Sequence, residues 1–383
     1  MTIARALALA PFFVAAACGS SSTSSGGGSL QLTASGEVLA LGGYAYPPAT
    51  PDDPAFVDGW DIAFKKLLVT IDKISLSQNP DTAAADQSLV GKQVAEVTGP
   101  WAIDLHKGGP ITGKGGTDEQ ALAITTLASQ NLTGGDGFDE TQRYAFGFDL
   151  VAGTTSAKRL NVTDNDADYA EMIAKGYAVM YIGTATWKGG STCTSSDDSF
   201  DFAKLPTKVS FRLGFPSPTT YVNCQNPDND PAKPLGSEEH QRGVQIKNNA
   251  ITLAQATVHT DHPFWESFTH DSPLHFDQLA ALAKQDASGH YVVTREDTVG
   301  VNYTAFTFAG AKLPWRTCLT GYTPPDTNAQ MGFDSRSVPY NPKGDPVTSV
   351  RDYADYLAYN QSTQGHLNSD GLCYVSRHYT SPR

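Results

Sequence analysis

Four of the chain's nine histidines lie within seventeen positions, in the segment HTDHPFWESFTHDSPLHFD at residues 259–277. Even scattering over 383 residues would place fewer than one histidine in such a window. Imidazole nitrogens are common protein ligands of zinc and of copper(II). The cluster therefore predicts a transition-metal site, for Zn(II) or Cu(II), with the ligands His259, His262, His270 and His275.

Carboxylates in the same segment are expected to support these imidazoles. Asp261, Glu266 and Asp271 could accept hydrogen bonds from ring nitrogens and so determine which nitrogen carries the proton. The chain has four methionines, and its cysteines are expected to be paired, which argues against a dedicated copper(I) site. His106 and His366 are weaker candidate ligands.

Each histidine also has an ordinary structural explanation. His262 could pack against Pro263, and His275 could interact with the end of its own helix. His259 could hydrogen-bond to Asp261. No two histidines of the segment have the i, i+4 spacing that makes a helical metal motif specific. The sequence leaves the metal site and these separate explanations open.

Alternating apolar residues predict that β-strands position these side chains. Between Trp60 and Ile71 the alternation changes phase near Lys65 and Lys66, which predicts one long strand with a β-bulge. Similar alternation recurs at residues 143–151, 177–187, 208–215 and 250–258. Because clusters of Gly, Pro, Asn and Asp separate these segments, we expect a mostly β fold, an antiparallel β-sandwich with a few short helices.

Three helices are expected. The spacing of apolar residues predicts one helix at residues 166–176 and another within residues 348–365. A third, within residues 272–289, should begin with Ser272 as its cap and Pro273 at its first position. The four clustered histidines would then lie at a strand end, in two loops and in the first turn of this helix.

Three aspartates have the spacing of a calcium-binding loop: Asp164, Asp166 and Asp168. Such a loop also needs a glycine for its sharp turn and a glutamate at its twelfth position, where this chain has Lys175. Helix capping by acidic residues explains the aspartates better.

The segment QSTQGHLNSDGLC, at residues 361–373, is rich in turn-forming residues. We interpret it as a polar surface loop that ends in a disulfide. It also holds His366, Asn368 and Asp370 close together, so a functional role is the alternative.

The cysteines of the body are even in number, which predicts two disulfides in an exported chain. They are Cys193, Cys224, Cys318 and Cys373. Three pairings are possible, and proximity in the sequence favours joining the first to the second and the third to the fourth. A metal site built from all four thiolates is the alternative, but no C-x-x-C spacing supports it.

The N-terminus has the pattern of an export signal. A positive charge at Arg5 precedes an apolar run, residues 6–17, that is too short to span a bilayer. The sequence AAAC, ending at Cys18, resembles the lipobox of bacterial lipoproteins, although Ala15 stands where that family usually has Leu. The resemblance covers only the first twenty or so residues. It implies that residues 1–17 are a signal peptide and that Cys18 carries a lipid.

The same resemblance implies where the body is held. Gly19, rather than Asp, after the lipidated cysteine is similar to lipoproteins sorted to the outer membrane of Gram-negative bacteria. Residues 18–29, rich in Ser and Gly, would form a flexible tether to a body facing the periplasm or the cell surface. An ordinary secretory signal with a chance cysteine is the alternative.

The composition excludes some partners and divides the body. The formal net charge of −13 and the absence of a Lys/Arg run argue against nucleic acid as a partner, and make the lipid the expected contact with the membrane. A polar, Pro-rich stretch at residues 226–243 suggests a boundary. It would separate a β-sandwich lobe at residues 30–235 from a second lobe at 236–383 that holds the histidines and short helices. One two-lobed domain is the alternative.

These features favour an exported, membrane-anchored lipoprotein that binds Zn(II) or Cu(II) for uptake or storage, with a transporter or a surface protein as partner. The first alternative is a module that binds a sugar, peptide or protein, since 17 Phe, 16 Tyr and 5 Trp could line a groove. The second is a metal-dependent hydrolase in which Glu266 or Asp271 acts as general base. Binding is favoured over catalysis.

Overall fold

The computed structural model describes residues 27–323 and 340–378. Cys18 and most of the predicted tether lie outside the described residues. Within them the fold is mostly β, as predicted, with five short α-helices and four short 3-10 helices. Among the described residues, no helix is long and apolar enough to cross a membrane.

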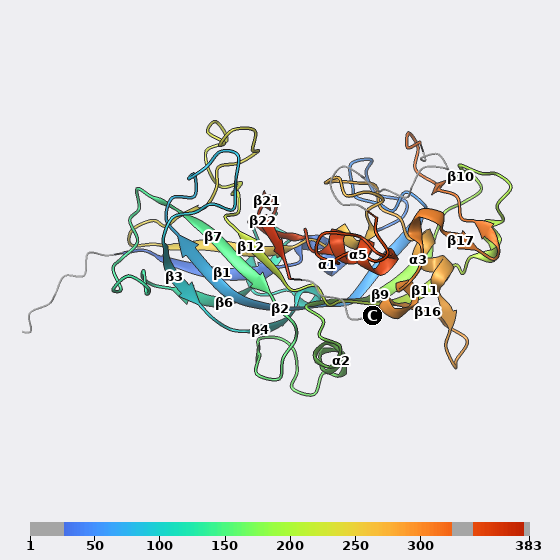
Figure 1. The fold of residues 1–383 in the computed structure, drawn as a ribbon, viewed down its shortest axis with the longest axis horizontal. Helices are drawn as coiled ribbons and strands as arrows, with labels where there is room; N and C mark the ends of the chain where they lie inside the picture. Colours follow the sequence, from blue (N-terminus) through green and yellow to red (C-terminus); the bar gives the residue numbers. More distant parts are fainter. Residues whose placement is uncertain (1–26, 324–339, 379–383) are drawn as a thin grey trace, which may run out of the picture.

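The larger of the two main sheets is built around one long central strand (Figure 1). Its main path runs β15 (Lys284–Gln285), β16 (Tyr291–Thr294), β11 (Lys208–Phe215), β9 (Val179–Trp187), β2 (Trp60–Ser77), β7 (Arg143–Leu150), β12 (Thr219–Val222) and β22 (Tyr374–Arg377). Four strands join it from the side: β3 (Gln93–Val97), β4 (Trp101–Asp104), β8 (Lys158–Arg159) and β13 (Val244–Gln245).

The smaller main sheet has six strands and carries the candidate site. Its order is β21 (Gly371–Leu372), β20 (Gly365–Leu367), β14 (Ile251–Val258), β1 (Ser29–Ser35), β6 (Gln120–Leu127) and β5 (Ile111–Thr112). Both sheets are mixed rather than purely antiparallel, because β1 runs parallel to β14 and β11 runs parallel to β16. Two further pairs stand apart: β10 (Thr194–Ser195) with β19 (Arg316–Thr317), and β17 (Thr307–Phe308) with β18 (Ala311–Lys312).

The two sheets share one hydrophobic core. Leu30 and Leu32 of β1 belong to the same cluster of buried side chains as Val69 and Ile71 of β2. This arrangement is the packing expected of a sandwich. Strands from both sides of residue 235 contribute to each sheet, and the predicted division into two lobes stays a prediction.

The central strand β2 confirms the predicted bulge and has two buried faces. Its pairing with β9 shifts register between Phe64 and Lys66. One face of β2 packs in the main core, whereas Leu68 on the other face packs against Met172 in a second cluster. Met172 belongs to helix α2 (Ala167–Lys175), which lies on the side of the sheet away from α1 (Glu37–Gly42) and α5 (Tyr353–Gln361) (Figure 1).

Helix α2 confirms the capping explanation of the aspartates. The Asp166 side chain accepts hydrogen bonds from the backbone N–H groups of Asp168 and Tyr169. Lys66 contributes ion pairs to Asp166 at 2.7 Å and to Asp168 at 2.6 Å. The helix ends at Gly176 in the left-handed conformation, with φ of 68°. These carboxylates are therefore already paired with cationic and backbone donors.

Helix α3 (Asp277–Leu282) begins later than the sequence predicted. Ser272 and Pro273 do not start it, because residues 273–275 bond to the preceding segment instead. The backbone N–H of His275 donates to the carbonyl of Phe264 at 2.9 Å, and that of Glu266 donates to the carbonyl of Pro273 at 2.9 Å. The remaining short helices are α4 (Arg295–Thr298), η1 (Leu105–Lys107), η2 (Phe202–Lys204), η3 (His262–Phe264) and η4 (Tyr303–Ala305).

Two disulfides form, as predicted, but the pairing that proximity in the sequence favoured was wrong. The bonds join Cys193 to Cys318 and Cys224 to Cys373. Strand pairing explains this: β10 pairs with β19 beside the first bond, and β12 pairs with β22 beside the second. Proximity along the chain does not reveal these long-range pairings.

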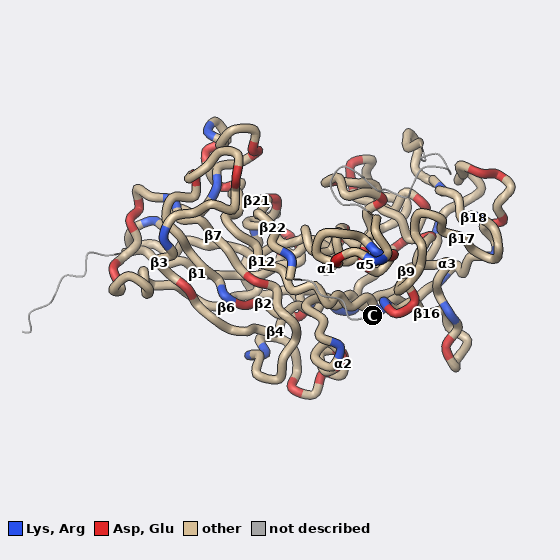
Figure 2. The backbone as a smooth tube through the Cα atoms, viewed as in Figure 1, with Lys and Arg blue, Asp and Glu red and all other residues tan. Residues whose placement is uncertain are grey.

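Lys and Arg lie interspersed among acidic residues over the described chain (Figure 2).

Candidate metal centre

Two histidines meet because their strands are neighbours. In the antiparallel pair of β14 and β20, Thr257 lies opposite His366. His259 follows two residues after Thr257 and therefore projects from the same side, and its backbone N–H bonds to the carbonyl of Gln364 at 3.1 Å. The ring centroids of His259 and His366 are 4.1 Å apart.

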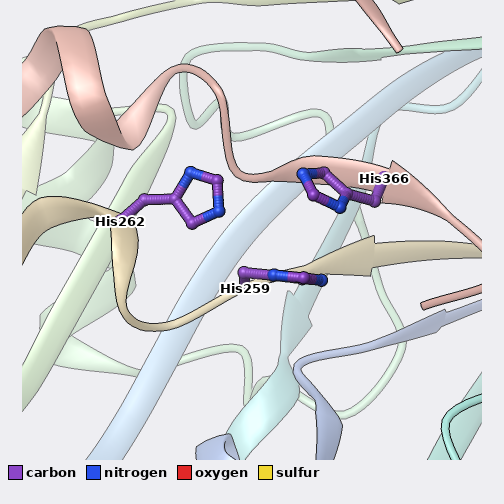
Figure 3. Close-up of side chains that lie close together, drawn as sticks. All are labelled: His259, His262 and His366. Carbon is purple, nitrogen blue, oxygen red and sulfur yellow. The ribbon is translucent and has the colours of Figure 1, made fainter. Parts of the chain in front are cut away.

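His262 completes a compact group of three. The chain turns after β14 into η3, which begins at His262. The ring centroid of His262 lies 5.4 Å from that of His259 and 5.5 Å from that of His366. One nitrogen from each ring lies within 4.8 Å of the other two, and all three residues are buried. Figure 3 shows the three rings gathered around one point.

Thr363 determines the tautomer of His262. The Thr363 hydroxyl donates its hydrogen to the carbonyl of Asn360 at 2.8 Å. That hydroxyl therefore accepts the 2.7 Å bond from Nδ1 of His262, and the proton of His262 resides on Nδ1. Nε2 is left with its lone pair, is buried, and has no hydrogen-bond partner among the described residues.

The other two rings are fixed in a similar way. Nε2 of His366 bonds to the carbonyl of Thr363 at 3.2 Å, so this nitrogen is the donor. Its Nδ1 is buried without a hydrogen-bond partner among the described residues. Nε2 of His259 donates to the carbonyl of Ser369 at 3.1 Å, which leaves Nδ1 as the acceptor nitrogen of that ring. Each ring therefore has one nitrogen held by the protein and one nitrogen with a lone pair.

Burial and neighbouring charges set the protonation of these rings. Burial lowers the pKa of His262 well below its usual value, and the nearby histidines lower it further. Burial has the same effect on the pKa of His366. Burial also disfavours protonation of His259, but the carboxylates of Glu37 and Asp261 outweigh it and raise its pKa. Two of the three rings are thus neutral at neutral pH, the form that binds metals.

His270 lies at the rim of this group. Its ring centroid is 6.2 Å from that of His262 and 5.8 Å from that of His366. Its side chain is 42% exposed and pairs with Asp271 at 3.1 Å. Trp265 stacks on the ring of His262, with centroids 3.8 Å apart. His270 is therefore the one member of this set whose side chain is open to solvent.

His275 lies apart from the three histidines, in a cluster of its own. Its Nε2 pairs with Glu266 at 2.8 Å, and its Nδ1 lies 3.7 Å from the carboxylate of Asp58. Tyr322 donates a hydrogen bond to Glu266. Burial disfavours the charged ring, but these two carboxylates outweigh it and raise the pKa of His275 to about 9. We interpret His275 as a charged structural residue.

The remaining predicted residues have other contacts. Asp261 accepts a hydrogen bond from the indole of Trp265 at 3.2 Å rather than from His259. His106 bonds through Nδ1 to the carbonyl of Ala40 at 2.7 Å.

Sequence reasoning ranked His366 as weak and did not name Thr363. The segment 361–373 was interpreted as a surface loop, and this was wrong for the part that contains β20, which is buried between β14 and β21. Asn368 and Ser369 form a tight turn with φ of 54° and 75°. A short hairpin pattern, GHL and GLC around that turn, was the signal that could have identified these strands.

Comparisons with models of protein families, with curated proteins and with solved structures find no match for this chain.

The pairing of His275 predicts a specific pH dependence of stability. The pKa of His275 is about 9 in the folded protein and 6.5 in the unfolded chain. Its contribution to the free energy of unfolding is therefore fully present below pH 6.5 and is lost as the pH rises through 9. We expect wild type to exceed His275→Gln in free energy of unfolding at pH 6, and this difference to shrink by about 3 kcal/mol by pH 10. Urea denaturation of both proteins measures it. A difference that stays constant with pH would contradict the assignment.

Proposed function

We propose that the protein binds one transition-metal ion, Zn(II) or Cu(II), through His259, His262 and His366. The observation that carries the proposal is the pair of buried nitrogens, Nε2 of His262 and Nδ1 of His366, that have no hydrogen-bond partner among the described residues. An unpaired buried polar atom costs roughly 1–3 kcal/mol. A metal ion held by these lone pairs would remove that cost.

The donor set fits these two ions. Three imidazole ligands suit Zn(II) or Cu(II), whereas soft thioether ligands would suit copper(I). The nitrogens lie within 4.8 Å of one another, and bonds of 2.0–2.1 Å to a tetrahedral ion would bring them to about 3.3 Å. The three rings would have to move closer together by this amount to bind one ion. His270 could supply a fourth ligand from the rim.

Uptake or storage accounts for the site better than hydrolysis. A hydrolytic zinc site needs an open position and room for a substrate beside the metal. Here the three ligands are buried, and Trp265 covers one face of His262. We propose that the body is exported and anchored to the outer membrane through lipid on Cys18, where a transporter or surface protein would exchange metal with it.

Elemental analysis by mass spectrometry tests the metal site. We expect the protein, purified without chelators, to hold one zinc or copper per chain and His262→Ala/His366→Ala to hold almost none. His290→Ala/His378→Ala, which removes two histidines outside the group, should match wild type. A folded wild type that stays metal-free after incubation with zinc and copper(II) salts would refute the proposal.

Thr363 gives a second test, because it orients two ligands without being one. In Thr363→Val the hydroxyl acceptor for Nδ1 of His262 is lost, and we expect metal affinity to fall about 10- to 100-fold. Thr363→Ser keeps that hydroxyl and should stay within about threefold of wild type. Competition titration against a chelator measures both affinities. Equal affinities of the Val and Ser variants would show that Thr363 does not control the ring.

A second candidate function is binding of an anionic sugar, favoured by two adjoining clefts. One has a volume of about 310 Å³ and is lined by Trp187 and Phe202, whose ring centroids each lie 4.6 Å from the Arg316 guanidinium. The other, of about 660 Å³, is lined by Lys65 and Lys208 among others. The clefts share residues 203 and 205–207.

The larger cleft lies on the other side of the large sheet from the histidines. Thr184 in the larger cleft projects from the same face of β9 as Ile182, which packs against α2. Tyr181 projects from the opposite face and donates a hydrogen bond to the carbonyl of His259 at 3.2 Å. A ligand in the larger cleft would therefore bind independently of the metal.

Calorimetric titration with a galacturonate trimer tests this candidate. We expect Lys65→Gln/Lys208→Gln to weaken binding at least tenfold, because the two lysines supply the charge complementary to the sugar carboxylates. Lys158→Gln/Lys247→Gln lowers the net charge equally outside the clefts and should leave binding unchanged. The absence of any heat of binding in wild type would count against sugar binding. An equal loss of affinity in both double variants would also count against it.

A further inference from the structure

A second group of ligating atoms lies directly beside the three histidines. One oxygen each of Glu37 and Asp370 and one nitrogen of His259 lie within 4.8 Å of one another. Nε2 of His259 is 3.5 Å from a Glu37 oxygen, so this group uses the side of the ring that faces away from the lone pair on Nδ1. The two groups therefore share one imidazole.

Three neighbouring strands bring these residues together. Glu37 follows β1, His259 follows β14, and Asp370 follows the turn after β20, in a sheet where β20, β14 and β1 are adjacent. Ser369 connects them: its hydroxyl donates to Glu37 at 2.8 Å and its carbonyl accepts from His259. The left-handed backbone at Ser369, with φ of 75°, turns Asp370 out of the strand.

Exposure of the side chains rises in steps from the three-histidine group out to Asp370. The His262 side chain is 1% exposed, that of His259 is 12% and that of Glu37 is 18%, while Asp370 is exposed to solvent. The innermost end holds the two unpaired histidine nitrogens. A path that begins at carboxylates and ends at buried lone pairs has the chemistry of a route for a cation.

We propose that Glu37, Asp370 and His259 form an outer position that captures a divalent cation and passes it to the three-histidine site. The inference rests on the proposed function. His259 contacts the cation through Nε2 at the outer position and through Nδ1 at the inner one, which requires only that its ring proton exchange between the two nitrogens. The carbonyl of Ser369, 3.1 Å from Nε2, offers another oxygen ligand outside.

Stopped-flow loading with copper(II) chloride tests the outer position. Trp265, stacked on His262, reports arrival of copper at the inner site through quenching of its fluorescence. We expect Glu37→Gln/Asp370→Asn to load at least tenfold more slowly than wild type and also to release copper more slowly into excess EDTA. Asp164→Asn/Glu239→Gln, with the same change in net charge at exposed sites, should load within twofold of wild type.

The outcomes separate the two proposals. Slower loading together with slower release identifies groups on the path, because removing an intermediate raises the barrier in both directions. Loading of the Glu37→Gln/Asp370→Asn variant at the wild-type rate, or slower loading with faster release, would overturn the outer position and leave the inner site intact. Failure of wild type itself to bind copper(II) or zinc would refute the inner site, and the outer position with it.

Discussion

The candidate site depends on one backbone pairing, that of β14 with β20. This pairing places His366 beside His259, although 107 positions separate them in the sequence. It also places Thr363, three residues before His366, where its hydroxyl and carbonyl each hold one imidazole. The disulfide between Cys224 and Cys373 and the pairing of β12 with β22 tie down the chain that leaves β20. A shift of one residue in the register would move His366 to the other face of the sheet.

The second constraint on the candidate site is that buried polar atoms need hydrogen-bond partners. Asn360 lies in the last turn of α5 and Thr363 lies just beyond its end. Because the Thr363 hydroxyl donates to the carbonyl of Asn360, it acts as an acceptor for His262. The protein therefore holds one nitrogen of each ring and leaves the other with its lone pair, in three rings that lie close together. Three separate structural histidines would each need a second partner, since buried polar groups are nearly always bonded. Two unpaired nitrogens within one compact group of imidazoles are what distinguishes a ligand set from chance packing.

Local patterns in the sequence predicted much of the fold. Alternation of apolar residues identified β2 with its bulge, and helical spacing identified α2 and α5. These features depend on neighbours in the chain, which a sequence displays directly. The disulfide pairing, the late start of α3 and the role of His366 depend on contacts between distant segments. Three of the four predicted ligands gather in space, at His259, His262 and, at the rim, His270.

Two histidines of one segment show why residue type alone does not define a site. His262 and His275 are both buried and stand thirteen positions apart. His262 faces other imidazoles and a threonine, so burial prevails and its pKa falls well below the usual value. His275 lies between Asp58 and Glu266, whose charges outweigh burial and raise its pKa to about 9. The first ring keeps a lone pair that can bind a cation, whereas the second carries a proton on each nitrogen and is itself the cation that its carboxylates bind.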